Sequence, residues 1–161
     1  MTIHRAGIHR PAGLWPNGHT EGAVTLDFDA RHRRRMRLTT DQGEEILLDL
    51  PRSVAMANGD GLQLDDRRWI TIQAAAELVL EISHKDPNQL MRIAWHLGNR
   101  HLPTEIRNSV LRIRPDRVIV EMLDGLGADL VTLQAPFQPE GGAYNRHSHH
   151  HDHDDSRQRH E

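Results

Sequence analysis

The order of strands and helices expected in the second half of the chain most restricts what it can fold into. Between residues 76 and 135, apolar residues alternate or recur at helical spacing. They predict a strand, a helix, two strands, a second helix and a last strand. This is the split βαβ order, so the sequence predicts a ferredoxin-like βαββαβ domain.

Both helices of this pattern have start and stop signals. Asp86 is placed to cap the first helix, with Pro87 at its first position, where a missing N–H costs little. Gly98 is expected to end that helix. Pro115 is expected to open the second helix, which the glycine-rich residues 125–127 stop. Residues 104–107 and 110–113 are expected to form two strands joined by a short turn.

The first half of the chain has the pattern of short strands. Apolar residues alternate at 24–28, 36–38, 46–50, 62–64 and 70–72, and glycine, aspartate and proline separate these runs. We therefore expect an α+β protein with three parts. These are a small β-rich domain at 1–75, a ferredoxin-like domain at 76–144 and a disordered histidine-rich tail at 145–161.

Several function classes are disfavoured by simple features of the chain. The first 22 residues hold no apolar stretch of the kind found in secretory signals, and no run is long enough to span a membrane. The net charge of −3 gives no general attraction to nucleic acid. The expectation is a cytoplasmic protein without membrane or nucleic-acid partners.

The tail carries the clearest chemical signal, since six of the 13 histidines lie at or after His147. Imidazole and carboxylate bind divalent metals at neutral pH, and a short tract rich in both binds them without a fold. The chain has no cysteine, so any metal must be held by nitrogen and oxygen, and imidazole-rich sites suit Ni, Cu and Zn. The candidate tail ligands are His147, His149, His150, His151 and His153.

Two other interpretations of the tail stay open. A histidine tract can be an added purification tag, or it can be solvated and idle. Ser148 and Asp152 interrupt this tract and Asp154 follows it, whereas a designed tag is more often an unbroken terminal run. Metal binding is therefore the favoured interpretation.

A basic run from Arg31 to Arg37 holds five arginines and one histidine. It is most simply the solvated face of a strand or loop. An acidic protein partner is the second interpretation, and nucleic acid is the third, although no aromatic residue lies within the run to stack on bases.

Two internal histidines, His96 and His101, lie five residues apart. On a helix that spacing separates them by about 140°, and Gly98 should end the helix between them, so one chain is not expected to chelate an ion with both. His96 is expected to be packed and structural. His101 lies past the helix end, where an exposed and rigidly placed imidazole suits a metal site. One imidazole is too few, but a two-fold dimer would double it and leave an incomplete, accessible site suited to a carrier.

The stretch from Trp95 to His101, with Pro103 and Ile106 after it, resembles the signature of urease accessory protein E, the nickel metallochaperone family of urease maturation. The run PFQPEGGAY at 136–144, leading into a histidine-rich end, resembles that family as well. The resemblance covers almost the whole chain, and it implies that the domain at 1–75 binds protein partners and that the domain at 76–144 binds metal.

The resemblance implies a homodimer through the C-terminal domains, with His101 of each subunit holding Ni²⁺ at the interface and the tail histidines adding ligands. Ni²⁺ would be cargo, passed to the urease accessory GTPase and the urease apoprotein–accessory complex, and Zn²⁺ or Cu²⁺ could bind the same groups. Some members carry two further histidines where this chain has Arg114-Pro115-Asp116-Arg117. No second internal site is therefore expected here.

Two other functions compete with nickel delivery as interpretations of the sequence. A general divalent-metal buffer or storage protein would keep the tail without a link to urease. A metal-dependent hydrolase needs three fixed ligands and a general base. The only candidate base near His101 is Glu105, which is expected to face solvent, so the chain is not expected to be an enzyme.

Overall fold

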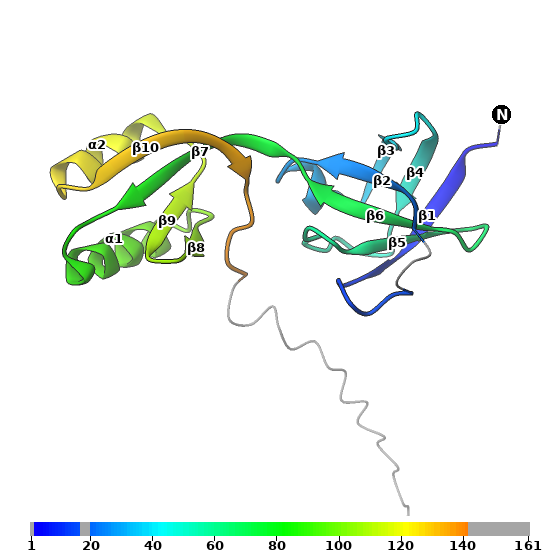
Figure 1. The fold of residues 1–161 in the computed structure, drawn as a ribbon, viewed down its shortest axis with the longest axis horizontal. Helices are drawn as coiled ribbons and strands as arrows, with labels where there is room; N and C mark the ends of the chain where they lie inside the picture. The colour runs from blue at the N-terminus through cyan, green and yellow to red at the C-terminus, as the bar shows by residue number, and fades with distance from the viewer. Residues whose placement is uncertain (1, 17–19, 142–161) are drawn as a thin grey trace, which may run out of the picture.

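The computed structural model describes residues 2–16 and 20–141, which form two sheets lying side by side along the long axis of the molecule (Figure 1). Strand β6 (Trp69–Ala74) belongs to the first sheet and leads almost directly into β7 (Ala76–Ser83) of the second. The protein is a mixed α+β structure in which a curled β-sheet precedes a βαββαβ region. The tail expected at 145–161 lies outside the described residues.

Six strands form the first sheet, in the order β2-β6-β5-β1-β4-β3. The remaining strands are β1 (His4–Arg10), β2 (Thr20–Leu26), β3 (Arg35–Thr39), β4 (Glu45–Asp49) and β5 (Gly61–Leu64). Successive side chains of a strand point to opposite faces, so the alternating apolar residues gather on one side. They form an aliphatic core in which Val24, Ile46, Leu48, Ile70 and Ile72 are fully buried.

Strand β1 lies inside this sheet, between β4 and β5, yet the sequence pattern did not predict it. Its only buried residue is Ala6, and its other positions are half-buried or exposed. A strand with one small inward residue lacks the alternation of large apolar side chains that reveals strands in sequence. Pairing with two neighbours, one parallel and one antiparallel, holds it in place.

The second sheet has four antiparallel strands in the order β10-β7-β9-β8. Its other strands are β8 (Glu105–Arg107), β9 (Val110–Ile113) and β10 (Asp129–Pro136), and its helices are α1 (Pro87–Asn99) and α2 (Arg117–Gly125). Ile93 and Leu97 of α1 share one core with Ile119 and Leu123 of α2 and with apolar residues of β7 and β9. Both helices therefore cover the same face of the sheet, and the predicted βαββαβ order is present (Figure 1).

The ends of the helices correct two details of the prediction. Asp86 caps α1 as expected, accepting a hydrogen bond from the Asn88 amide at 2.9 Å. The prediction that Gly98 ends α1 is wrong, because the helix continues to Asn99 and Arg100 is its C-cap. Helix α2 starts at Arg117 rather than at Pro115, because Asp116 is its N-cap and accepts from two backbone amides.

An aromatic and charged cluster joins the two sheets. Phe137, just after β10, is fully buried, and its ring centroid lies 5.3 Å from that of Phe28 in the N-terminal region. Arg31 lies in the short 3₁₀ helix η1 (Ala30–His32), is only 2% exposed and donates a hydrogen bond to the Phe137 carbonyl. Burial lowers the pKa of Arg31, while the carboxylates of Glu77 and others oppose that shift.

The basic run is therefore not a uniform solvated face. That interpretation is wrong for Arg31, whose side chain is a buried link between the two halves of the chain. It holds for Arg33, Arg34, Arg35 and Arg37, which are exposed. Sequence alone could not separate the first arginine from the others, because the groups that surround it come from distant segments.

Candidate metal centre

His101 occupies the position just after the C-cap of α1, with a left-handed backbone φ of 53°. Its N–H donates to the Gly98 carbonyl at 3.0 Å, and the N–H of Leu102 donates to the Leu97 carbonyl at 3.3 Å. This pair of bonds is the Schellman motif, in which the left-handed residue is usually glycine. The motif fixes the backbone of His101 while the residue remains exposed.

The electrostatics at this helix end favour a cation. The last carbonyls of an α-helix carry a partial negative charge, so a metal ion is stabilised there. His96 is half-buried one turn earlier, with its ring edge-on to Trp95 at a centroid distance of 5.1 Å. The two histidines therefore have different surroundings, as their spacing predicted.

A groove of about 820 Å³ lies between the two halves of the chain, and His101 lines it whereas His96 does not. The N-terminal side contributes Phe28, His32 and residues 53–57, and the C-terminal side contributes the end of α1, residues 101–104 and Ile106. Residues 138–141 complete the lining. The sequence predicted neither the groove nor a place for His32 in it, because His32 lies within the basic run.

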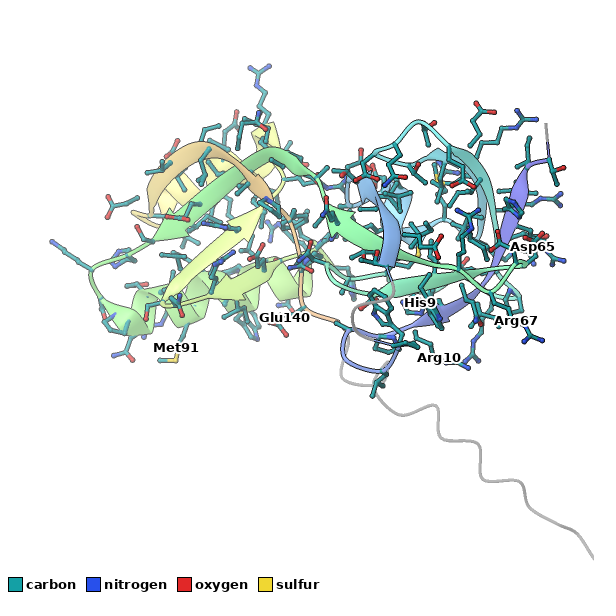
Figure 2. The ribbon with its side chains drawn as sticks, turned by 45° about the vertical axis from the view of Figure 1, so that its right-hand side comes forward. His9, Arg10, Asp65, Arg67, Met91 and Glu140 are labelled. Atoms are coloured by element: carbon teal, nitrogen blue, oxygen red, sulfur yellow. The ribbon has the colours of Figure 1, made fainter. Side chains whose placement is uncertain are left out.

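Three hydrogen bonds hold the segment after β10 along this groove. The Gln138 amide donates to Glu105 at 3.1 Å, and the Gln138 side chain accepts from the Asn58 amide at 2.9 Å. The Glu140 amide donates to the Thr104 carbonyl at 2.8 Å. Glu140 lies where the two halves meet (Figure 2). The described structure therefore ends at Gly141, one residue after Glu140, which is bonded to a residue three positions after His101.

Glu105 does not face solvent, so that expectation is wrong. Its residue is 7% exposed, and its carboxylate accepts from the Gln138 amide and from Arg107 at 3.3 Å. Those bonds hold the segment that crosses between the sheets. A carboxylate occupied in this way serves structure, and it is poorly placed to act as a general base.

An apolar stripe runs along the outer face of α1. Met91 and Trp95 are 63% and 64% exposed, and Met91 projects away from the helix in Figure 2. A Cβ added at Gly98 would meet nothing within 4 Å, so the helix surface is open there too. Residues at this spacing lie on one face of a helix, and the stripe leads toward His101.

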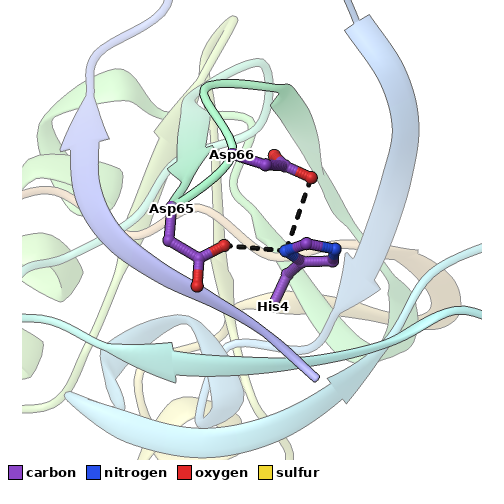
Figure 3. Close-up of side chains that lie close together, drawn as sticks. All are labelled: His4, Asp65 and Asp66. Carbon is purple, nitrogen blue, oxygen red and sulfur yellow. Dashed lines mark hydrogen bonds and ion pairs between the residues drawn. The ribbon is translucent and has the colours of Figure 1, made fainter. Parts of the chain in front are cut away.

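His4, Asp65 and Asp66 form a separate cluster in the first sheet, with potential ligand atoms within 4.8 Å of one another (Figure 3). His4 Nδ1 lies 2.8 Å from Asp65 and 3.4 Å from Asp66. The Asp66 oxygen that faces His4 also accepts from Arg68 at 2.7 Å. Hydrogen bonds from His4 and from the Arg5 amide lower the pKa of Asp65. The cluster is thus an ion-pair network that ties β1 to the turn between β5 and β6.

The predicted tail ligands His147, His149, His150, His151 and His153 lie outside the described residues. Among the helices of the described part, none is long and apolar enough to cross a membrane.

Comparison with known proteins matches both halves of the chain. The family model described as "UreE urease accessory protein, N-terminal domain" matches residues 2–75, and the corresponding C-terminal domain model matches residues 77–161. The urease accessory protein UreE of Bradyrhizobium sp. (strain ORS 278) is 56% identical over 129 residues, which are 80% of this chain and 61% of that protein.

Two other relatives are covered more fully. The urease accessory protein UreE of Beijerinckia indica subsp. indica is 48% identical over 92% of this chain and 86% of its own length. That of Rhizobium leguminosarum bv. trifolii (strain WSM2304) is 44% identical over 93% and 78%. The chain spans 56–65% of the length of four Bradyrhizobium and Rhodopseudomonas relatives, which is less than two thirds. By both family models and by these relatives, the chain belongs to the UreE urease accessory protein family.

Proposed function

We propose that this protein is a nickel-binding metallochaperone that delivers Ni²⁺ for assembly of the urease metallocentre, through the urease accessory GTPase complex. In this proposal the protein is a carrier and not an enzyme. His101 is the primary ligand. The tail residues His147, His149, His150, His151 and His153 are secondary ligands.

The observation that carries the proposal is the backbone hydrogen bond that holds Glu140, shortly before the tail, next to the segment that follows His101. The Glu140 amide is bonded to Thr104, three residues after His101. His147 is six positions after Gly141, and six steps of extended chain span at most about 20 Å. The length of the chain therefore allows the first tail imidazoles to reach His101, so a metal ion can exchange between this exposed ligand and secondary ones.

The apolar stripe of α1 supports a homodimer that completes the site. Exposed Met91 and Trp95 are poorly placed in contact with water, and aromatic residues are common anchors of protein interfaces. A two-fold axis near the C-terminal end of the stripe would bring two copies of His101 together. The paired site would have two imidazoles and open positions, which suits release to a partner.

The chemistry of the ligand set supports nickel as an exchangeable cargo. With no cysteine in the chain, only nitrogen and oxygen ligands are available. Such ligands also bind Cu²⁺ and Zn²⁺, and copper binds them more tightly than nickel. Selectivity must therefore come from metal supply and from docking to the correct accessory protein rather than from affinity.

Calorimetric titration with Ni²⁺, together with light scattering, tests the proposal. The protein would be a full-length variant with all six tail histidines replaced by alanine, compared with the same variant carrying His101→Ala. We expect one nickel ion per dimer in the first and none in the second. If the first variant binds no nickel, the metal chemistry lies in the tail and the general metal buffer becomes the better description.

A further inference from the structure

We propose that His32, in the N-terminal half, is a second metal ligand for the cargo ion, in the groove that His101 also lines. The inference rests on the proposed function and extends it to a residue of the other half of the chain. His32 and His101 come from opposite sides of the same groove of about 820 Å³. A metal ion that leaves His101 along the groove therefore meets a second imidazole on the N-terminal side.

The hydrogen bonding of His32 leaves the correct nitrogen free. Its Nδ1 lies 2.7 Å from the Phe28 carbonyl oxygen. A carbonyl only accepts, so Nδ1 carries the proton and the neutral ring has an unprotonated Nε2. Metal-binding histidines typically donate their other ring N–H to a carbonyl or carboxylate, which fixes the ring and makes the free nitrogen a better ligand.

The Phe28 carbonyl is itself held in place by packing. The Phe28 ring lies 4.4 Å from the His32 ring and 5.3 Å from that of Phe137, measured between centroids. The Arg114 guanidinium lies 4.7 Å above the Phe28 ring. The support for His32 therefore comes from both halves of the chain, although His32 is exposed.

His84 has the opposite arrangement, and the ring nitrogens of His4 and His9 are bonded outside the groove. His84 Nδ1 accepts a hydrogen bond from the Asp86 amide at 2.9 Å, so the proton of its neutral ring is on Nε2. His9 and His4 each have a ring nitrogen bonded to an aspartate, at 2.7 and 2.8 Å. Neither they nor His84 line the groove. His32 thus combines exposure, a place in the groove that His101 also lines and an Nε2 that no described residue engages.

The charge of neighbouring Arg31 does not block the site. Its guanidinium donates to the carbonyls of Phe137 and Asp27, and its charge is balanced by the nearby carboxylates of Asp27, Glu77 and Glu105. Glu140 adds a further carboxylate to the groove lining. These carboxylates offset the charge of Arg31 on the groove side of His32.

The test uses the full-length variant whose tail histidines are alanine, so that only internal ligands remain. His32→Asn keeps a side-chain N–H donor but removes the ligating Nε2, and His84→Asn is the matched control. We expect His32→Asn to weaken Ni²⁺ binding roughly 10-fold or more, since even loss of an outer-sphere partner of a metal ligand costs about 10–100-fold. His84→Asn should leave the affinity unchanged.

A spectroscopic measurement separates ligation from proximity. In the same protein, diamagnetic Zn²⁺ should shift the imidazole ¹⁵N resonance of His32 Nε2 and leave that of His84 in place. If the His101 resonance shifts while that of His32 does not, the inference is overturned and the proposed function stands. If neither shifts, both fail. If only the His32 resonance shifts, His32 is a metal ligand and His101 is not the primary one.

Discussion

In the first sheet, His4 and His9 each lie against an aspartate, at 2.8 and 2.7 Å, whereas His101 at the end of α1 is exposed and held through its backbone. The contrast shows two ways of placing an imidazole. An aspartate partner engages a ring nitrogen and makes the residue part of the scaffold. A backbone motif fixes the residue and leaves both ring nitrogens free for a ligand.

The two halves also differ in how much apolar surface they leave exposed. The curled first sheet closes around its own aliphatic core. In the second half, the helices cover one face of the sheet, yet Met91 and Trp95 of α1 remain exposed. Among the described residues, six of the nine exposed large apolar side chains lie in the second half, which therefore offers more apolar surface for association than the first half does. Four substitutions test these two contrasts.

Arg31→Ala should have the largest effect, because Arg31 is the buried charge that joins the two halves. Its loss leaves the nearby carboxylates and the Phe137 carbonyl without their partner, and removing one member of a buried charged set costs about 3–5 kcal/mol. Urea denaturation measures the change, with exposed Arg33→Ala as the control. Equal stability of the two variants would show that the junction does not depend on this residue.

Trp95→Glu should come next, because it places a charge in the centre of the apolar stripe of α1. Loss of a central aromatic anchor costs about 2–4 kcal/mol of association free energy, which is a factor of about 30 or more in the dimer dissociation constant. Analytical ultracentrifugation measures it. Val118→Glu, at a residue of α2 that is 71% exposed, is the matched control. A monomer from the control and not from Trp95→Glu would place the interface on α2.

Asp60→Ala tests the scaffold role of the His9–Asp60 pair. Asp60 is 4% exposed and accepts from His9 and from the amides of Ala12 and Ala57. Leaving those donors unpaired should cost about 1–3 kcal/mol near neutral pH. Asp124→Ala, on the surface of α2, is the control.

The effect of Asp60→Ala should depend on pH. Burial alone would raise the pKa of Asp60, but the hydrogen bonds from His9, Ala57 and Ala12 outweigh it and hold the pKa below its usual value. A carboxyl whose pKa is lower in the folded state stabilises the fold above its unfolded pKa of about 3.9, and this contribution is lost as the pH falls through the folded value. The difference between wild type and Asp60→Ala should therefore shrink on acidification. A constant difference would contradict the ionised role of this group.

His101→Gly should have the smallest effect on stability and the opposite sign. Glycine adopts the left-handed C′ position without the strain of a side chain, so the free energy of unfolding should stay equal or rise by up to about 1 kcal/mol. His101→Ala should be the less stable of the two. Both should lose the internal nickel site. A His101→Gly protein less stable than His101→Ala would show that the imidazole itself supports the fold.

Much of the second half could be predicted from sequence, because its signals are local. Asp86 with Pro87 marked the start of α1, and the spacing of its apolar residues gave the face that packs on the sheet. Asn108 and Ser109, with φ values of 41° and 67°, form the expected turn between β8 and β9. The exact end of α1 could not be predicted, because glycine was expected at the left-handed position that His101 occupies.

The sequence by itself determined the α+β class, the βαββαβ order and His101 as an exposed residue, since helical spacing, strand alternation and capping act over a few neighbouring residues. Only the tertiary structure decided that β1 is a strand, that Arg31 and Glu105 are buried, and that His32 shares a groove with His101. Each of those outcomes depends on segments far apart in the chain, which meet through strand pairing within the first sheet or through contact between the two halves. Burial and proximity are properties of that packing, and no local pattern encodes them.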